Sequence, residues 1–220
     1  MIGEILRARI LALQMIPNLS PELAHVLHLD DRYRSIGLIS SDSDDVTYMA
    51  LDEATKTANV EVVYARSLYA GAANASTALA GEVIGILAGP TPAEVASGLR
   101  AAEAFIRSGV GFRTANEQGD VIYLAHCVSR TGSYLSEVAQ IPQGQALAYL
   151  VAPPVEAVAA LDAALKASDV ELRQFFAPPT ETNFSGGLLT GTQSACQAAC
   201  EAFAQTVRSI AAEPNDLGGM

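Results

Sequence analysis

Short apolar runs alternate along the chain with longer alanine-rich segments, and the order is the same in both halves. Apolar runs of this length predict strands, and the alanine-rich segments predict helices. The predicted strands that flank the first helices of each half cover residues 8–16, 35–39, 60–65, 121–128, 146–151 and 170–176. Each half reads strand, helix, strand, helix, strand, strand, helix. This order predicts an α/β (α+β) fold in which each half forms one mixed sheet with its helices on one side.

Capping signals mark the starts of two helices. Ser20-Pro21 places a capping serine before a proline at the first helical position. Thr91-Pro92-Ala93-Glu94 has the form of a capping box, and its helix should run to Ser108 and stop at Gly109. The glycine-containing segment 109–111 is therefore a natural boundary inside the chain.

The two halves are also related by sequence. Residues 50–61 (ALDEATKTANVE) and 160–171 (ALDAALKASDVE) are identical at seven of twelve positions, with an offset of 110, and they contain both lysines of the chain. Amphipathic patterning alone does not require the same lysine and glutamate at matching places. We therefore predict a tandem duplication, with one domain at 1–110 and a second at 111–220.

The offset between the halves changes along the chain. It falls to 102 between Gly89 and Gly191, so the second half has a loop that is shorter by eight residues. The loops affected are polar and contain glycine, and they cover residues 66–80 and 177–187. Loops in equivalent positions of a symmetric assembly would converge on one axis. Three copies of a two-repeat chain would place six units around an axis with only threefold equivalence, so the loops could differ.

Composition narrows the range of partners. The chain has 220 residues, half of them apolar and only 17% charged, with a net charge of −11. This charge disfavours binding to nucleic acids and to anionic membranes. The apolar runs are shorter than the roughly twenty residues of a membrane span. A surface so poor in charge predicts large contacts between subunits, and three cysteines without disulfide spacing predict a cytoplasmic, reducing location.

The sequence contains fragments of several catalytic and metal-binding motifs. His126-Cys127 begins like a phosphatase loop, but Arg130 comes too early to close it. Residues 186–192 lack the lysine of a phosphate-binding loop, and Asp42 to Asp45 lack the later ligands of a calcium loop. His25 and His28 share a helix face without further metal ligands, and Cys196 and Cys200 suit a packed helix face. We therefore expect no enzymatic activity, no catalytic residue, no metal site and no cofactor.

Asp44 and Asp45 admit two interpretations. Both lie in the first turn of a predicted helix, where acidic residues complement the helix dipole. Alternatively, one of the carboxylates contacts a small cation.

Several long segments together resemble a known family. They are residues 35–56, 62–76, 126–136, 148–154 and 177–200, and the resemblance extends from about residue 6 to 211. In this order they are similar to the tandem-domain bacterial microcompartment shell proteins of the ethanolamine-utilisation type. The resemblance implies two circularly permuted shell (BMC) domains, and a homotrimer that imitates a hexamer. It further implies that these trimers tile with other shell proteins around enzymes that handle a volatile aldehyde.

The resemblance also implies two kinds of pore. A central pore on the threefold axis would be gated by the two polar loops, with these residues: Ser67, Tyr69, Gly71, Asn74, Thr180, Glu181 and Phe184. A small pore within each subunit would bind ethanolamine through Asp45, Glu82, Phe112, Thr182 and Asn183. The carboxylates would accept from the ammonium group and the Thr and Asn side chains would bond the hydroxyl, while the Phe ring would face the cation.

Two other functions remain open from the sequence. One is a trimeric sensor that binds a small molecule without a role in a shell. The other is an enzyme of ethanolamine metabolism, although the sequence contains no complete pairing of nucleophile and base.

Overall fold

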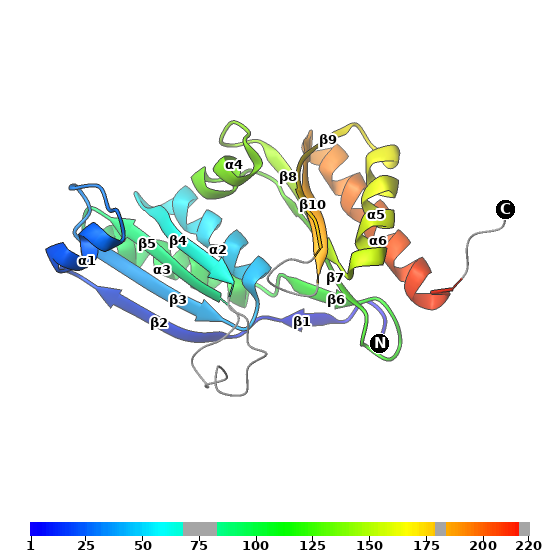
Figure 1. Ribbon diagram of the computed structural model, residues 1–220, viewed down its shortest axis with the longest axis horizontal. Coiled ribbons are helices and arrows are strands. Elements are labelled where there is room, and N and C mark those ends of the chain that lie inside the picture. The colour runs from blue at the N-terminus through cyan, green and yellow to red at the C-terminus, as the bar shows by residue number, and fades with distance from the viewer. Residues whose placement is uncertain (68–82, 179–183, 216–220) are drawn as a thin grey trace. The chain divides into compact units, whose positions relative to one another are not determined.

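The computed structural model of the protein describes residues 1–67, 83–178 and 184–215. The chain divides into two compact units (Figure 1). Unit 1 contains residues 1–6, 111–131 and 138–220, and unit 2 contains residues 7–110 and 132–137. None of the helices in the described part of the chain is long and apolar enough to cross a membrane.

Unit 2 is built on a four-stranded sheet. Its order is β2 (Ile10–Ile16), β3 (Ser35–Ser41), β5 (Val83–Gly89) and β4 (Glu61–Ser67), and each neighbouring pair is antiparallel. The prediction of a mixed sheet is therefore wrong for this unit. Strands β3 and β4 run parallel to each other, but β5 lies between them, so a parallel pair never forms.

Both faces of this sheet are covered. Helices α2 (Asp44–Thr57) and α3 (Pro92–Arg107) pack on one face around Ile39, Leu51 and Leu87. The short helix α1 (Pro21–Val26) and its flanking loops pack on the opposite face, over Ile36, Ile86 and Ala88. The prediction that all helices lie on one side is therefore also wrong, because β5 is buried on both faces and needs cover on each.

Two glycines let the larger helices approach the sheet. A Cβ at Gly37 would lie 2.7 Å from Leu99 Cγ, and a Cβ at Gly85 would lie 2.6 Å from Leu51 Cδ1. Real Cβ atoms do not tolerate such distances, so glycine fixes how closely α2 and α3 pack on β3 and β5.

The cap before α3 forms only in part. Thr91 Oγ1 accepts from the Glu94 backbone N–H at 3.3 Å, as predicted. The Glu94 carboxylate, however, accepts from the Asn59 backbone N–H at 2.7 Å. Glu94 therefore links α3 to the turn after α2. Ser20 caps α1 as predicted, by accepting from the Leu23 N–H.

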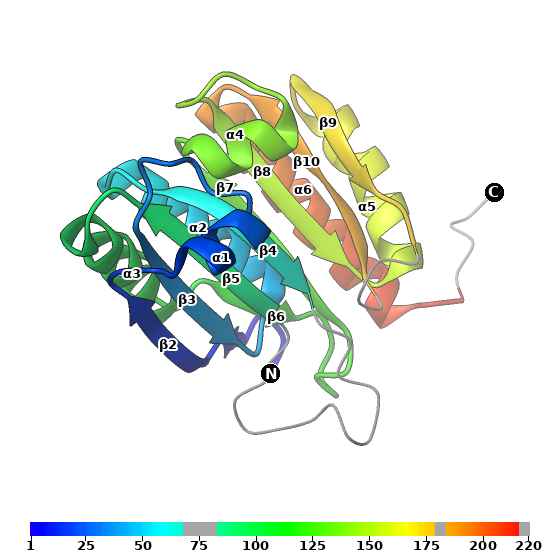
Figure 2. The same ribbon diagram turned by 60° about the vertical axis from the view of Figure 1, so that its left-hand side comes forward.

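Unit 1 contains the larger sheet. Its order is β1 (Ile5–Arg7), β6 (Gly111–Thr114), β7 (Ile122–Val128), β8 (Ala146–Ala152), β10 (Ser185–Gly191) and β9 (Val170–Phe176). Helices α5 (Pro154–Ala167) and α6 (Gln193–Ala212) lie side by side along one face of this sheet (Figure 2). Their shared core contains Leu150, Leu161, Leu189 and Phe203.

The duplication is confirmed by the strand order. The sequence β2-β3-β5-β4 in unit 2 matches β7-β8-β10-β9 in unit 1. Backbone conformation repeats as well, because His28 and Gln140, which follow the short helices α1 and α4 (Ser133–Ala139), have φ values of 53° and 52°. Residues other than glycine rarely adopt positive φ values, so their recurrence at matching places supports the duplication.

The division of the chain into one domain at 1–110 and a second at 111–220 stays a prediction. Two short segments group with the unit formed mainly by the other half of the chain. Residues 1–6 belong to unit 1, where Gly3 donates its N–H to Thr114 O at 2.8 Å. Residues 132–137, which begin α4, belong to unit 2.

Candidate functional site

Asp45 lies in the first turn of α2, where the sequence predicts it. The residue is only 9% exposed. Hydrogen bonds fix this turn. Ser41 Oγ and Thr47 Oγ1 lie 2.6 Å apart, and Thr47 Oγ1 also donates to Ser43 O at 2.8 Å. The Asp45 carboxylate is therefore placed at the start of a fixed helix, with little access to solvent.

Asp44 is bonded to the beginning of one predicted gating loop. Its carboxylate accepts from the Asp45 N–H at 2.8 Å and from Ser67 Oγ at 2.6 Å. Ser67 Oγ also lies 2.8 Å from Tyr48 Oη. Ser67 ends β4, so the predicted gating loop departs from a serine attached to two side chains of α2.

The other predicted gating loop ends at an aromatic pair. Phe112 in β6 is 8% exposed, and its ring centroid lies 5.2 Å from that of Phe184 at an angle of 38°. Phe184 immediately precedes β10. Unit 1 thus brings one predicted ethanolamine-binding residue against one predicted gating residue.

The remaining predicted residues lie outside the described part of the chain. These are Glu82, Thr182 and Asn183 of the predicted ethanolamine site, with Tyr69, Gly71, Asn74, Thr180 and Glu181 of the predicted gating loops. Asp45 belongs to unit 2 and Phe112 to unit 1. The proposed ethanolamine site therefore stays a prediction.

The cysteines have the character of core residues. Cys127 is half-buried, and burial raises the pKa of its thiol. Burial likewise raises the pKa of the buried Cys196 and Cys200 thiols. Thiolates are the reactive form of cysteine, so these groups are poor nucleophiles at neutral pH. Among the described residues, no three His, Cys, Asp or Glu side chains gather as a metal site would require.

A cavity of about 460 Å³ opens in unit 1, between α6 and β7. Polar side chains in its wall include Arg113, Tyr123, Gln197, Glu201 and Arg208. Arg208 Nη1 lies 3.4 Å from Tyr123 Oη, and Arg113 Nη1 donates to Gly3 O at 3.2 Å. These guanidinium groups are thus engaged with the protein. None of the predicted site residues within the described ranges lines the cavity.

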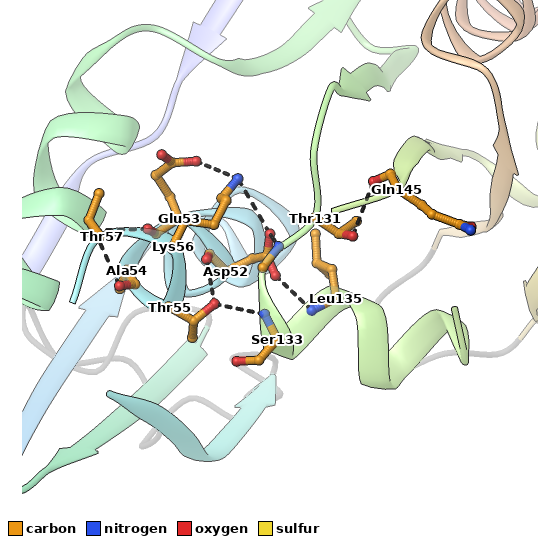
Figure 3. Close-up of polar contacts among 11 residues, drawn as sticks. Asp52, Glu53, Ala54, Thr55, Lys56, Thr57, Thr131, Ser133, Leu135 and Gln145 are labelled. Carbon is orange, nitrogen blue, oxygen red and sulfur yellow. Dashed lines mark hydrogen bonds and ion pairs between the residues drawn. The ribbon is translucent and has the colours of Figure 1, made fainter. Parts of the chain in front are cut away.

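Sequence reasoning missed a buried carboxylate in unit 2 (Figure 3). Asp52 on α2 is fully buried, and it accepts from the backbone N–H groups of Gly132 and Leu135, each at 2.8 Å. Lys56 Nζ lies 3.5 Å from the same carboxylate. Burial raises the pKa of Asp52, and the two N–H donors and the Lys56 charge oppose that rise.

Asp52 acts as the cap of α4, supplied by another helix. Gly132 precedes α4 and has no side chain to cap it, so Asp52 takes the two N–H groups that a capping box would satisfy. Thr55 extends the contact by accepting from the Ser133 N–H at 3.0 Å. The signal in the sequence was the repeated Asp and Lys of 50–61 and 160–171, but the pattern gave no partner for them.

Known proteins are similar to this chain over nearly its whole length. The BMC domain family model matches residues 35–116. Over 212 residues the chain is 66% identical to the bacterial microcompartment shell protein EutL of Clostridium perfringens, and the match covers 96% of this chain and 98% of that protein. The chain belongs to the EutL family of bacterial microcompartment shell proteins.

Solved structures agree with this assignment. A crystal structure of EutL from Clostridium perfringens has a TM-score of 0.95 at 64% identity, and the match covers 99% of each chain. The trimeric microcompartment shell protein PduB has a TM-score of 0.73 at 20% identity, over 93% of this chain and 89% of that one, and so shares the fold. As a member of the EutL family the chain is a structural shell component and not an enzyme, as the sequence predicts. Its location is the microcompartment shell in the bacterial cytoplasm.

Proposed function

We propose that the chain forms a homotrimer that tiles with other shell proteins around the ethanolamine-utilisation compartment, and that its central pore is gated by residues 66–80 and 177–187. One observation carries the proposal, which is the recurrence of a single strand order in both units of the chain. Three such chains supply six similar units to a ring. The unequal lengths of the two loops are compatible with threefold symmetry but not with sixfold symmetry.

The described residues at one end of each proposed gating loop are held by side-chain contacts. One loop leaves from Ser67, which bonds to Asp44 and Tyr48. The other returns at Phe184, which packs against Phe112. Anchored ends confine any rearrangement to the residues between them.

We further propose that ethanolamine binds at Asp45, Glu82, Phe112, Thr182 and Asn183. Ethanolamine is a small ammonium ion with a hydroxyl group. A buried carboxylate such as Asp45 is a strong acceptor for an ammonium group, because the low local dielectric strengthens the charge-assisted bond. Phe112 would add a ring face toward the cation.

Assembly tests the proposed trimer and shell role. Light scattering of the purified protein should give the mass of three chains, and concentrated protein should form flat layers in electron microscopy. A trimer that never forms layers would favour a sensor without a shell role. A stable monomer would contradict the proposal.

A further inference from the structure

Helix α4 packs on α2 inside unit 2 through a compact set of contacts (Figure 3). Asp52 caps Gly132 and Leu135, and Thr55 Oγ1 accepts from Ser133. One turn earlier on α2, Tyr48 meets Tyr134, with 6.3 Å between the ring centroids. The face of α2 that receives α4 therefore runs through Tyr48, Asp52 and Thr55.

The repeat identifies a second copy of each surface. An offset of 110 maps Tyr48, Asp52 and Lys56 of α2 onto Val158, Asp162 and Lys166 of α5. An offset of 112, set by the matching turns at His28 and Gln140, maps Tyr134 and Leu135 of α4 onto Glu22 and Leu23 of α1. A short helix and a receiving face thus occur at corresponding places in both halves of the chain.

Among the residues that the structure describes, one of the two pairs is covered and the other is open. On α2 the side chains of Asp52 and Lys56 are 0% and 14% exposed, whereas on α5 those of Asp162 and Lys166 are 62% and 75% exposed. Val158 on the same face of α5 is 50% exposed. The face of α5 is thus open where its counterpart on α2 is closed.

The short helices show the same contrast. Leu135 of α4 is 1% exposed, but its counterpart Leu23 of α1 is 42% exposed. Val26, at the end of α1, is 67% exposed. Every residue of α1 is exposed or half-buried. Exposed apolar side chains, Leu23 and Val26 on α1 and Val158 on α5, are therefore left open on both surfaces.

We infer that α1 of one copy docks on the Val158–Asp162–Lys166 face of α5 in a second copy, and so reproduces the packing of α4 on α2. The occupant is a second copy of this chain because the matching helix is part of the chain itself. The two surfaces differ, so the contact is head-to-tail, and such contacts close into a ring when the rotation permits. This inference rests on the proposed homotrimer and specifies which elements join its subunits.

The two contacts differ at one point of chemistry. Ser20 already caps α1 by accepting from the Leu23 N–H, whereas α4 depends on Asp52 for its cap. Asp162 is therefore not needed to cap Leu23 in the second contact. Packing of Leu23 and Val26 on α5 should contribute more to this contact than polar bonds do.

Cross-linking of paired cysteines tests the contact. Glu22 and Val158 correspond to the Tyr134–Tyr48 pair and are both exposed. In a Cys127→Ser background, Glu22→Cys/Val158→Cys should give covalent dimers and trimers with a short bis-maleimide on a denaturing gel. Each single-cysteine variant should stay monomeric on the gel. The two single variants assembled together should stop at dimers.

A matched pair controls for proximity within any trimer. Glu171 follows the C-terminal end of α5 and is 68% exposed, so Glu22→Cys/Glu171→Cys should give several-fold less cross-linked product. Light scattering is run on every variant before the reagent is added. A trimer in which Glu22→Cys/Val158→Cys reacts no more than this control overturns the inference and leaves the proposed trimer intact. A monomer in light scattering overturns both.

Discussion

The Asp52 carboxylate accepts a hydrogen bond from the Leu135 backbone N–H at 2.8 Å, although the two residues are 83 positions apart in the sequence. The bond joins a helix of the first repeat to the start of a helix of the second repeat, inside unit 2. Because Asp52 is fully buried, its two N–H partners lose their acceptor if the carboxylate is altered.

Replacing Asp52 by Asn should therefore lower the free energy of unfolding by about 1–3 kcal/mol, since an amide presents one acceptor oxygen where the carboxylate presents two. Denaturant titration followed by circular dichroism measures the change. Asp31→Asn removes the same charge from an exposed loop of the same unit and should change stability by less than about 0.5 kcal/mol. Equal stability of Asp52→Asn and wild type would show that α4 does not depend on this cap.

Gly132→Ala should destabilise unit 2 more severely than a surface substitution. A Cβ at this position would overlap Thr55 Oγ1 and lie 2.5 Å from the Asp52 carbonyl oxygen. The added Thr55→Ala change removes the clash with Thr55 Oγ1 and leaves those with Asp52, so the double variant should recover part of the lost stability. Independent, additive effects in a double-mutant cycle would contradict this packing.

Asp45→Asn should weaken ethanolamine binding by about ten- to a hundredfold, because a charge-assisted contact contributes about 1.5–3 kcal/mol. Titration calorimetry with ethanolamine measures the affinity. Asp42→Asn is the matched control, since Asp42 lies three positions earlier and pairs with Arg9 at 2.8 Å. If both variants bind as wild type does, Asp45 is not part of the ligand site.

Tyr33 should make the protein less stable in alkali. Burial and the neighbouring Glu61 raise the pKa of Tyr33 to about 12, above the ordinary value of 10.0. The unfolded chain then releases the phenol proton first, so stability present below pH 10 is lost as the pH rises toward 12. Tyr33→Phe should unfold with a shallower dependence on pH over this range. Parallel curves for the two proteins would show that Tyr33 does not contribute.

The sequence predicts the repeat and the order of elements because both follow from local patterning and from matching letters. It does not predict that β5 lies between β3 and β4, since the neighbour of a strand depends on packing across the sheet. The packing of α1 and its flanking loops on the second face of β5 was not predicted, for the same reason. A residue such as Ile86 has the same apolar character whether one face of its strand is buried or two.

The candidate site was predicted by resemblance more than by physical pattern. Asp45 and Phe112 are ordinary residues of a helix start and a strand when the sequence is read alone. Asp52 escaped notice because its partners are backbone N–H groups, which leave no trace in side-chain identity. Only the fold brings a glycine at position 132 to a carboxylate at position 52.

The cap that α2 supplies to α4 also bears on the order in which parts of the chain fold during synthesis. A ribosome completes α2, with Asp52, well before it adds Gly132, whereas α1 emerges with its own cap in Ser20. The first short helix thus has its capping group next to it in the sequence. The second must find a receptor that was translated some eighty residues earlier, so its formation reports that the first half of the nascent chain has already folded.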